Sequence, residues 1–431
     1  MTRAGGATLG VRCGPTMRNI VFVAPFPLET TMRFARAAAK LKDVRFLGVL
    51  QEEPKGRDRK MFDDVVTVKD GLDTKQLARG IDALRKRYGR VERILGILEP
   101  LQVQLAELRA YFEVPGTDPR TADLFRDKAR MKDALREAGL PVARHKLLGN
   151  FETGQMFARE VGYPMVLKPP AGMGAKATFR VGDDAALRGA LISMHTSETN
   201  PMLAEEFLRG NEYSFETITT GGEVRFHSLS KYLPSCLAVL ENPWIQWCCL
   251  LPRDIAGNEW NEAKRIGYGA VKALGLDDGF THMEWFRRND GTLAIGEIAQ
   301  RPPGANITLM TGLAHALSAS GGAPETPMDP YRAWARAVVD GAFDGPYERK
   351  YAVGCAYLRG AGRGRIVRVE NADAVNKKIG KWVEEAKLPT IGAPKSDSYE
   401  GDGFAVVRDK DTKVVEEVLQ YIIENVRVVY A

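Results

Sequence analysis

The stretch THMEWFRRNDGTLAIGEIAQRPPGANI, residues 281–307, decides the fold that we expect for this chain. It contains two runs of alternating apolar and polar residues around Asp290-Gly291, a dipeptide typical of a two-residue β-hairpin turn. In that register Glu284 lies opposite Glu297, and two facing glutamates repel each other unless a cation lies between them. Mg²⁺ binds one or two protein carboxylates together with substrate phosphates, so the pair predicts a metal–nucleotide site. A solvated strand with chance charges is the alternative.

Length and composition favour a globular protein of several domains. The chain has 431 residues, of which 44% are hydrophobic and 27% charged, which is enough for roughly three domains. Apolar runs stay short of the ~18 residues of a membrane span, so we expect no membrane partner. Residues 1–16 lack the apolar core of a secretory signal and are expected to form a disordered tail.

Cysteine usage and charge narrow the expected location and partners. The five cysteines are odd in number and show neither disulfide nor metal-ligand spacing, which favours a reducing, cytoplasmic location. The net charge of +6 is spread along the chain. This balance argues against a nucleic-acid partner and suits an anionic small ligand.

The first quarter of the chain predicts a doubly wound α/β domain. Apolar strand-like runs alternate with helical patterns such as residues 74–88, which is typical of β-α-β units with a parallel sheet. The loop after the first strand, FPLETT, lacks the glycine pattern of a dinucleotide site. Glu99 follows the last strand of this domain, at the end of the sheet where such folds bind ligands. An acid in the first turn of a helix explains Glu99 equally well.

A loop of small residues follows the strand that ends at Lys168. The segment AGMGAKATF contains Gly172, Gly174 and Lys176, and bare backbone amides in such a loop approach phosphates closely. A glycine-rich hairpin that binds nothing has the same appearance. This segment therefore gains meaning only from its neighbours.

The order and spacing of four segments resemble the ATP-grasp superfamily. These segments are DKARMKDALREAGLPVARH, GYPMVLKPPAGMGAKATFRV, AEEFLRGNEYSFE and HMEWFRRNDGTLAIGEIAQRPPG. The resemblance implies a mixed α/β and α+β fold whose ATP site lies between a lid and a sheet. Its expected parts are a pre-ATP-grasp domain at 17–125, an ATP-grasp domain at 126–345 with a lid at about 147–207, and a β-rich C-terminal module at 346–431.

The resemblance also implies roles for individual residues, all of which would meet ATP, its metal ion or the acyl phosphate. Lys128 and Lys168 are expected to contact the phosphates of ATP, and the loop with Gly172, Gly174 and Lys176 is expected to cover those phosphates. The Glu205 side chain and the backbone of Glu206 and Leu208 are expected to bind adenine, and Glu212 is expected to bind the ribose. Glu284 and Glu297 are expected to bind Mg²⁺ or Mn²⁺, and Arg301 is expected to contact the acyl phosphate.

One position departs from the family pattern. Many members carry Asn two residues after the second metal glutamate, whereas this chain has Ala299. The hairpin register places His282 opposite Ala299. We therefore predict that His282 fills the vacated space and either orients Glu297 through a hydrogen bond or contacts the substrate acid. The alternative is an ordinary half-buried strand histidine.

The whole-chain layout resembles the L-amino-acid ligases, which are related to biotin carboxylase and purine-pathway enzymes. The resemblance implies ATP-dependent activation of a small-molecule carboxylate, followed by attack of an amine to give an amide or peptide bond. A carboxylase that activates bicarbonate and a nucleotide-binding module without turnover are the alternatives, and a homodimer is left open. The aromatic candidates for a substrate pocket, or for the core, are Tyr232, Trp244, Trp247 and Trp285.

Overall fold

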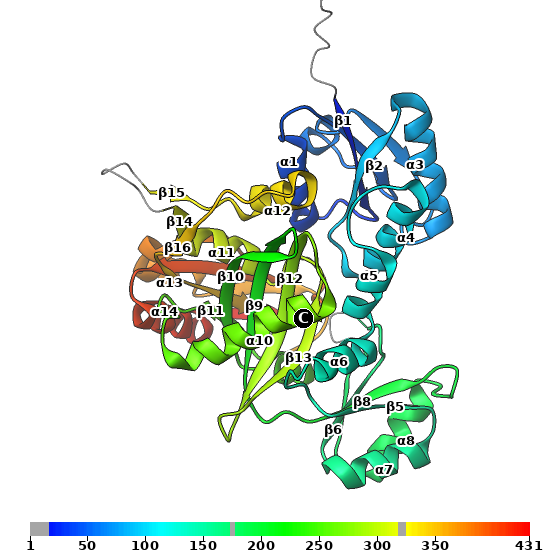
Figure 1. Cartoon of the computed structure of the whole chain (residues 1–431). Coiled ribbons are helices and arrows are strands. Elements are labelled where there is room, and N and C mark those ends of the chain that lie inside the picture. Colours follow the sequence, from blue (N-terminus) through cyan, green and yellow to red (C-terminus); the bar gives the residue numbers. More distant parts are fainter. Residues whose placement is uncertain (1–16, 173–176, 318–324) are drawn as a thin grey trace, which may run out of the picture.

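The computed structural model describes residues 17–172, 177–317 and 325–431. An N-terminal lobe, a lid and a large body built on one central sheet make up this part of the chain (Figure 1). The tail expected at residues 1–16 and the loop residues Gly174 and Lys176 lie outside the described residues. No helix of the described part is long and apolar enough to cross a bilayer.

The N-terminal lobe has the parallel sheet that the sequence predicts. Its strands follow the order β3-β2-β1-β4, and all pairs are parallel. The strands are β1 (Arg18–Ala24), β2 (Val44–Leu50), β3 (Asp64–Thr67) and β4 (Val91–Leu95). The helices of the lobe are α1 (Glu29–Ala39), α2 (Arg57–Lys60), α3 (Thr74–Tyr88) and α4 (Gln102–Phe112), with a 3-10 turn at Glu99–Leu101. Nearly all of β1 is buried, because helices cover both faces of a parallel sheet.

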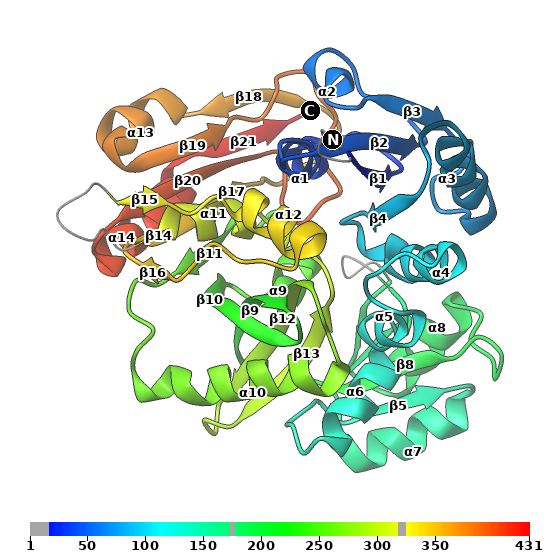
Figure 2. The same cartoon turned by 45° about the horizontal axis from the view of Figure 1, so that its top comes forward.

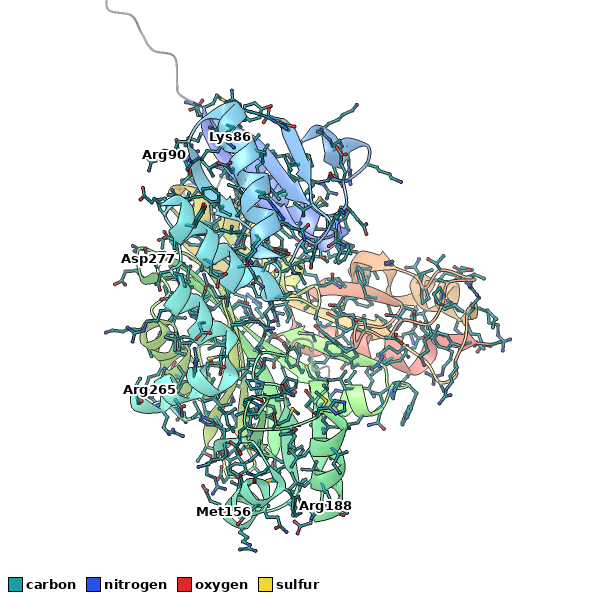
Figure 3. The ribbon with its side chains drawn as sticks, turned by 90° about the vertical axis from the view of Figure 1, so that its right-hand side faces the viewer. Lys86, Arg90, Met156, Arg188, Arg265 and Asp277 are labelled. Atoms are coloured by element: carbon teal, nitrogen blue, oxygen red, sulfur yellow. The ribbon has the colours of Figure 1, made fainter. Side chains whose placement is uncertain are left out.

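Two helices connect this lobe to the lid, which has its own antiparallel sheet. The connecting helices are α5 (Pro119–Arg126) and α6 (Lys128–Glu137). The lid sheet has the order β5-β8-β6-β7. Its elements are β5 (His145–Leu148), α7 (Phe151–Val161), β6 (Met165–Lys168), β7 (Phe179–Val181), α8 (Asp184–Ser193) and β8 (Met202–Glu206). Met156 on α7 and Arg188 on α8 mark the outer end of the lid (Figure 3).

The body is organised on an eight-stranded sheet of order β13-β12-β9-β10-β11-β17-β20-β19. Its strands are β9 (Gly210–Thr220), β10 (Glu223–Leu233), β11 (Trp247–Leu251), β12 (Gly279–Arg288), β13 (Leu293–Ala299), β17 (Ala352–Leu358), β19 (Val383–Lys387) and β20 (Gly403–Asp409). The C-terminal β-rich segment therefore extends the central sheet, and the boundary proposed at residue 345 does not coincide with a sheet edge.

Helices and small sheets complete the body (Figure 2). The helices are α9 (Cys236–Glu241), α10 (Asn258–Leu274), α11 (Ile307–Ala314), α12 (Pro330–Asp340), α13 (Ala372–Ile379) and α14 (Thr412–Asn425), with a 3-10 turn at Gly380–Trp382. The small-sheet strands are β14 (His315–Leu317), β15 (Thr326–Pro327), β16 (Tyr347–Arg349), β18 (Ile366–Glu370) and β21 (Arg427–Tyr430). Alternation along β11 sends Trp247 and Cys249 into the cluster beneath α11, and Cys248 into the cluster beneath α14.

The hairpin at β12 and β13 differs in detail from the prediction. Arg288 N donates to Thr292 O at 2.8 Å, and Gly291 N donates to Arg288 O at 2.9 Å. The loop therefore has three residues, 289–291, and the predicted two-residue turn is wrong. Gly291 has φ of 87°, the left-handed conformation that such a loop needs and that glycine adopts without strain.

A β-bulge restores the register that was expected. The pairing slips by one residue between Glu284 and Trp285, which leaves Gly296 as the extra residue of β13. Beyond this bulge Glu284 pairs with Glu297, and residues 282 and 299 pair as well. The facing glutamates are thus confirmed, because the bulge offsets the additional loop residue.

The N-terminal lobe and the body share a hydrophobic cluster centred on Trp334 of α12. Trp334 is 3% exposed and packs edge-on against Phe34 of α1 and Phe22 of β1. Strand residues of the body, Ile218 and Phe280, belong to the same cluster. Trp334 therefore anchors the core between the body and the N-terminal lobe.

We predict that Trp334→Ala destabilises the protein by about 3–5 kcal/mol, because it removes a buried aromatic ring and leaves a cavity. Urea unfolding followed by far-UV circular dichroism measures this. Trp244→Ala is the matched control, since Trp244 is 58% exposed and its loss is expected to change stability by less than about 0.5 kcal/mol. Equal effects of the two substitutions would contradict the assignment.

Candidate active site

A cavity of about 460 Å³ lies between the lid and the central sheet, a size typical of small-molecule sites. Candidate residues from the lid, α6 and the hairpin line it together. The described candidates that line this cavity are Lys128, Lys168, Gly172, Glu205, Glu206, Leu208, Glu212, His282, Glu284, Glu297 and Arg301. The fold therefore brings to one cavity residues that are far apart in the sequence.

Lys128 compensates the charge of Glu297. Lys128 begins α6 behind the N-cap Asp127, and its Nζ lies 3.0 Å from Glu297 Oε1 and donates to Gly172 O at 2.9 Å. Burial alone would raise the pKa of Glu297, but Lys128 and Lys168 outweigh it and lower the pKa to about 2. Glu297 is therefore a carboxylate, ready to bind a cation.

A second buried cluster surrounds Glu205. Lys168 Nζ lies 3.0 Å from Glu205 Oε2, and Lys132 Nζ lies 3.2 Å from Glu205 Oε1. Burial opposes ionisation of Glu205, yet the two lysines lower its pKa. The contact with Lys132 is an ion pair without hydrogen-bond alignment, since Oε1 accepts no hydrogen bond. Oε1 thus keeps a free lone pair, and the adenine contact expected of Glu205 stays a prediction.

Lys132 was not predicted, although a sequence signal for it existed. It lies four residues after Lys128 on the same helix, so both lysines face the same side. Its ammonium also donates to the Gly296 carbonyl, which belongs to the β-bulge residue. Lys132 therefore connects α6 both to the lid strand β8 and to the hairpin of β12 and β13.

Glu212 and Glu284 form a region of excess negative charge. Donor atoms of Glu212, Cys236 and Glu284 all lie within 4.8 Å of one another. Burial and the neighbouring Glu284 raise the pKa of Glu212 to about 8. A divalent cation would relieve this repulsion, so the carboxylates fit the predicted Mg²⁺ or Mn²⁺. Burial also raises the pKa of the Cys236 thiol, and Mg²⁺ prefers oxygen ligands. The carboxylates are therefore the candidate ligands, and Glu297 faces Glu284 across the hairpin.

His282 contacts a different glutamate from the one predicted. Its Nδ1 lies 3.0 Å from Glu216 Oε1 and its Nε2 lies 3.7 Å from Glu284 Oε1, so the predicted hydrogen bond to Glu297 is wrong. The reason is that β12 also pairs with β9, where His282 and Glu216 are partners. Burial lowers the pKa of His282, but the bonds to Glu216 and Glu284 outweigh it and raise the pKa to about 9.

Arg301 is held by Glu99 at the edge of the cavity. Arg301 Nε donates to Glu99 Oε2 at 2.9 Å, and Arg126 lies 3.4 Å from Glu99 Oε1. Arg126 also donates to Gly172 O at 2.8 Å. Glu99 therefore belongs to the site, as the position after a parallel strand suggested. Arg126 is a further site residue that sequence reasoning missed.

The aromatic candidates divide between the cavity and other places. Tyr232 and Trp247 line the cavity. Trp285 is completely buried in the cluster beneath α10, on the opposite face of the sheet. Trp244 is exposed.

Comparison with known proteins agrees with this geometry. Residues 125–235 match the family model described as an ATP-grasp domain. The L-arginine-specific L-amino acid ligase of Bacillus subtilis is 28% identical over 208 residues, which cover 47% of this chain and 49% of that relative. The matched region thus spans about half of the relative's length.

Solved structures extend the likeness to nearly the whole chain. The L-amino acid ligase from Bacillus licheniformis has a TM-score of 0.77 and 16% identity, with 96% of this chain and 99% of that one covered. The N5-carboxyaminoimidazole ribonucleotide synthetase from Thermotoga maritima has a TM-score of 0.69 and 18% identity, with 96% and 100% covered. The chain therefore contains an ATP-grasp domain and has the ATP-grasp fold over nearly its whole length.

We predict that Lys132→Met destabilises the ligand-free protein by about 3 kcal/mol, because it removes one partner of a buried ion pair. Lys272→Met, at an exposed position of helix α10, is the matched control and is expected to change stability by less than about 0.5 kcal/mol. Urea unfolding of both variants tests this. A silent Lys132→Met would show that Lys168 alone compensates Glu205.

A second prediction concerns pH. Because the pKa of His282 is raised to about 9 in the fold from about 6.5 in the unfolded chain, its stabilising contribution is complete below pH 6.5 and is lost as the pH rises through 9. The contribution is about 3 kcal/mol. In metal-free buffer, the free energy of unfolding should therefore fall more steeply between pH 6.5 and 9 for the native protein than for His282→Gln. Parallel slopes would refute a charged His282.

Proposed function

We propose that this protein is an ATP-dependent carboxylate–amine ligase whose small-molecule acid is an amino acid. The main support for this proposal is that Glu284 and Glu297 face each other in a cavity that Lys128, Lys168 and Arg301 also line. This set supplies both metal ligands and cations for a phosphate chain. The relative named as an L-amino acid ligase supports the same activity.

The nucleotide would lie at the lid end of the cavity. Lys128 and Lys168 would neutralise phosphate charge, and Glu284 and Glu297 would hold Mg²⁺ or Mn²⁺, which when bound supplies further charge neutralisation. Glu206 pairs through its side chain with Arg288 at 2.7 Å. Its carboxylate is thereby turned toward Arg288 of β12, which agrees with a role at adenine for the backbone of Glu206 and not for its side chain.

The reaction then follows from positioning and charge. A carboxylate oxygen of the acid attacks the γ-phosphorus of ATP, the bond to the bridging oxygen breaks, and ADP leaves. The amine nitrogen attacks the carbonyl carbon of the acyl phosphate, phosphate leaves, and the nitrogen loses a proton. Arg301 would stabilise the oxygen that becomes negative in the second step.

The two alternatives make different demands on the site. Activation of bicarbonate, by analogy with the carboxylating structural relatives, needs no room for an organic side chain. A nucleotide-binding module without turnover needs neither Arg301 nor its partner Glu99. Tyr399 and Ile307 also line the cavity, and such apolar wall residues favour an organic acid over bicarbonate.

We predict that Glu297→Gln lowers ATP turnover at least about a hundredfold, because one anionic metal ligand is lost while the amide keeps the side-chain shape. Glu223→Gln, at an exposed strand start of the same sheet, is the control and should keep full activity. Both variants should remain folded, and Glu297→Gln should unfold at a somewhat lower temperature because Lys128 loses its partner. Full turnover in Glu297→Gln would contradict the proposal that Glu297 binds the metal ion.

A substrate screen separates the proposed activities. ADP release is measured with Mg²⁺ for amino acids and other small acids, each with and without hydroxylamine, which converts acyl phosphates to hydroxamates. Acid-dependent hydroxamate is expected for a ligase. Release with bicarbonate alone would indicate a carboxylase, and no release with any acid would indicate a module without turnover.

A further inference from the structure

The cavity has two chemically different ends. The lid end is lined by the lysines and carboxylates described above. The other end is lined by members of one hydrophobic cluster beneath α11, and the rings that reach it are Tyr232, Trp247 and Tyr399. We refer to these three rings as the aromatic box. Leu237 and Leu240 of α9 line the cavity beside it.

The rings of the aromatic box are held in place from behind. Trp247 stacks on Tyr357 with ring centroids 4.2 Å apart, and Tyr232 meets Trp247 edge-on at 6.1 Å. Trp247 Nε1 donates to Tyr399 O at 2.7 Å, which satisfies the indole inside the protein. The three rings are therefore held in place before a ligand binds, and the indole N–H of Trp247 is not available to that ligand.

One hydroxyl edge of the box lies beside His282, and Arg301 lines the same cavity as the rings. Tyr232 Oη is 3.5 Å from His282 Nε2. A carboxylate held near Arg301 and His282 would direct its side chain along the rings.

Most described carboxylates of the cavity are already paired, and Glu212 and Glu284 are the candidates for the metal ion. Glu99 is held by Arg126 and Arg301, while Glu212 accepts from Cys236 N at 2.7 Å and adjoins Glu284. The three at the lid end, Glu205, Glu206 and Glu297, are paired with lysines or arginines. Behind the box, Glu400 accepts from Ala305 N at 3.0 Å. Once a divalent cation occupies Glu212 and Glu284, a basic side chain in the box would find no free counter-charge among the described residues.

We propose that the aromatic box binds the side chain of the acid substrate, and that this acid carries a flat, uncharged, apolar side chain of about phenyl size. The inference rests on the proposed function, because it assigns the acid to the Arg301 end of the cavity. It excludes basic acids such as arginine and leaves the amine undefined. α9 contributes Val239 to the same hydrophobic cluster and Leu237 and Leu240 to the cavity wall, so we expect its side chains to influence selectivity.

The test combines a substrate panel with a charge introduced into α9. Hydroxamate formation is measured for phenylalanine, 3-phenylpropionate, leucine, alanine, glutamate and arginine. For the native protein kcat/KM should be at least about tenfold higher for the phenyl acids than for alanine or arginine. Leu240→Asp places a carboxylate in the wall and should shift the arginine-to-phenylalanine ratio of kcat/KM toward arginine by at least about tenfold.

Ala238→Asp is the matched control, because Ala238 lies on α9 but is not among the described residues that line the cavity. It should leave the ratio unchanged. Binding of phenylalanine and arginine to the native protein with Mg²⁺ and ADP, measured by calorimetry, gives a readout independent of turnover. Preference for arginine or alanine, or an equal shift in both variants, would overturn the aromatic assignment while the ligase stands. No acid-dependent hydroxamate with any acid, together with no acid binding, would overturn the proposed function itself.

Discussion

Compensation of buried carboxylates by cations is the constraint on which this structure depends. Glu205 is buried, Glu297 is half-buried, and each is stable as a carboxylate only because a lysine lies about 3 Å away. The lysines come from α6 and from the lid, whereas Glu297 belongs to the body. The charges of the site are therefore also the contacts that hold the lid, α6 and the hairpin in one arrangement.

The β-bulge at Gly296 serves this arrangement in two ways. It corrects the register so that Glu284 faces Glu297, and the Gly296 carbonyl accepts from Lys132. A side chain would crowd this position, since a Cβ at Gly296 would lie 3.2 Å from the Phe286 ring. Bulges next to binding sites commonly re-aim side chains in this manner.

Sequence reasoning succeeded where a pattern is local and periodic. The parallel N-terminal sheet, the lid strands and the facing pair of Glu284 and Glu297 all follow from alternation, helical spacing and a turn signal. The register of the hairpin came out correctly through two opposite departures, an extra loop residue and a bulge. Hydrophobic periodicity does not reveal either departure, and the only sequence signals are the glycines Gly291 and Gly296.

Sequence reasoning failed where a side chain contacts a strand that is distant in the sequence. His282 was assigned from its hairpin neighbour alone, yet its nearest carboxylate, Glu216, comes from β9 on the other side of β12. Arg126 and Lys132 were missed for the same reason, because their partners Glu99 and Glu205 lie about thirty residues away or more. Only the three-dimensional pairing reveals such contacts.

The apolar end of the cavity has a different dependence on the fold. Trp247 and Tyr232 line the cavity, but they also belong to the cluster that joins β11 to the C-terminal strand β17 through Tyr357. Changing these rings would disturb the extension of the central sheet together with the ligand site. Leu237 and Leu240 lie on the short and partly exposed helix α9, so changing them would not disturb the central sheet. Variation in acid selectivity is therefore least costly on α9, whereas the ring positions are constrained by folding itself.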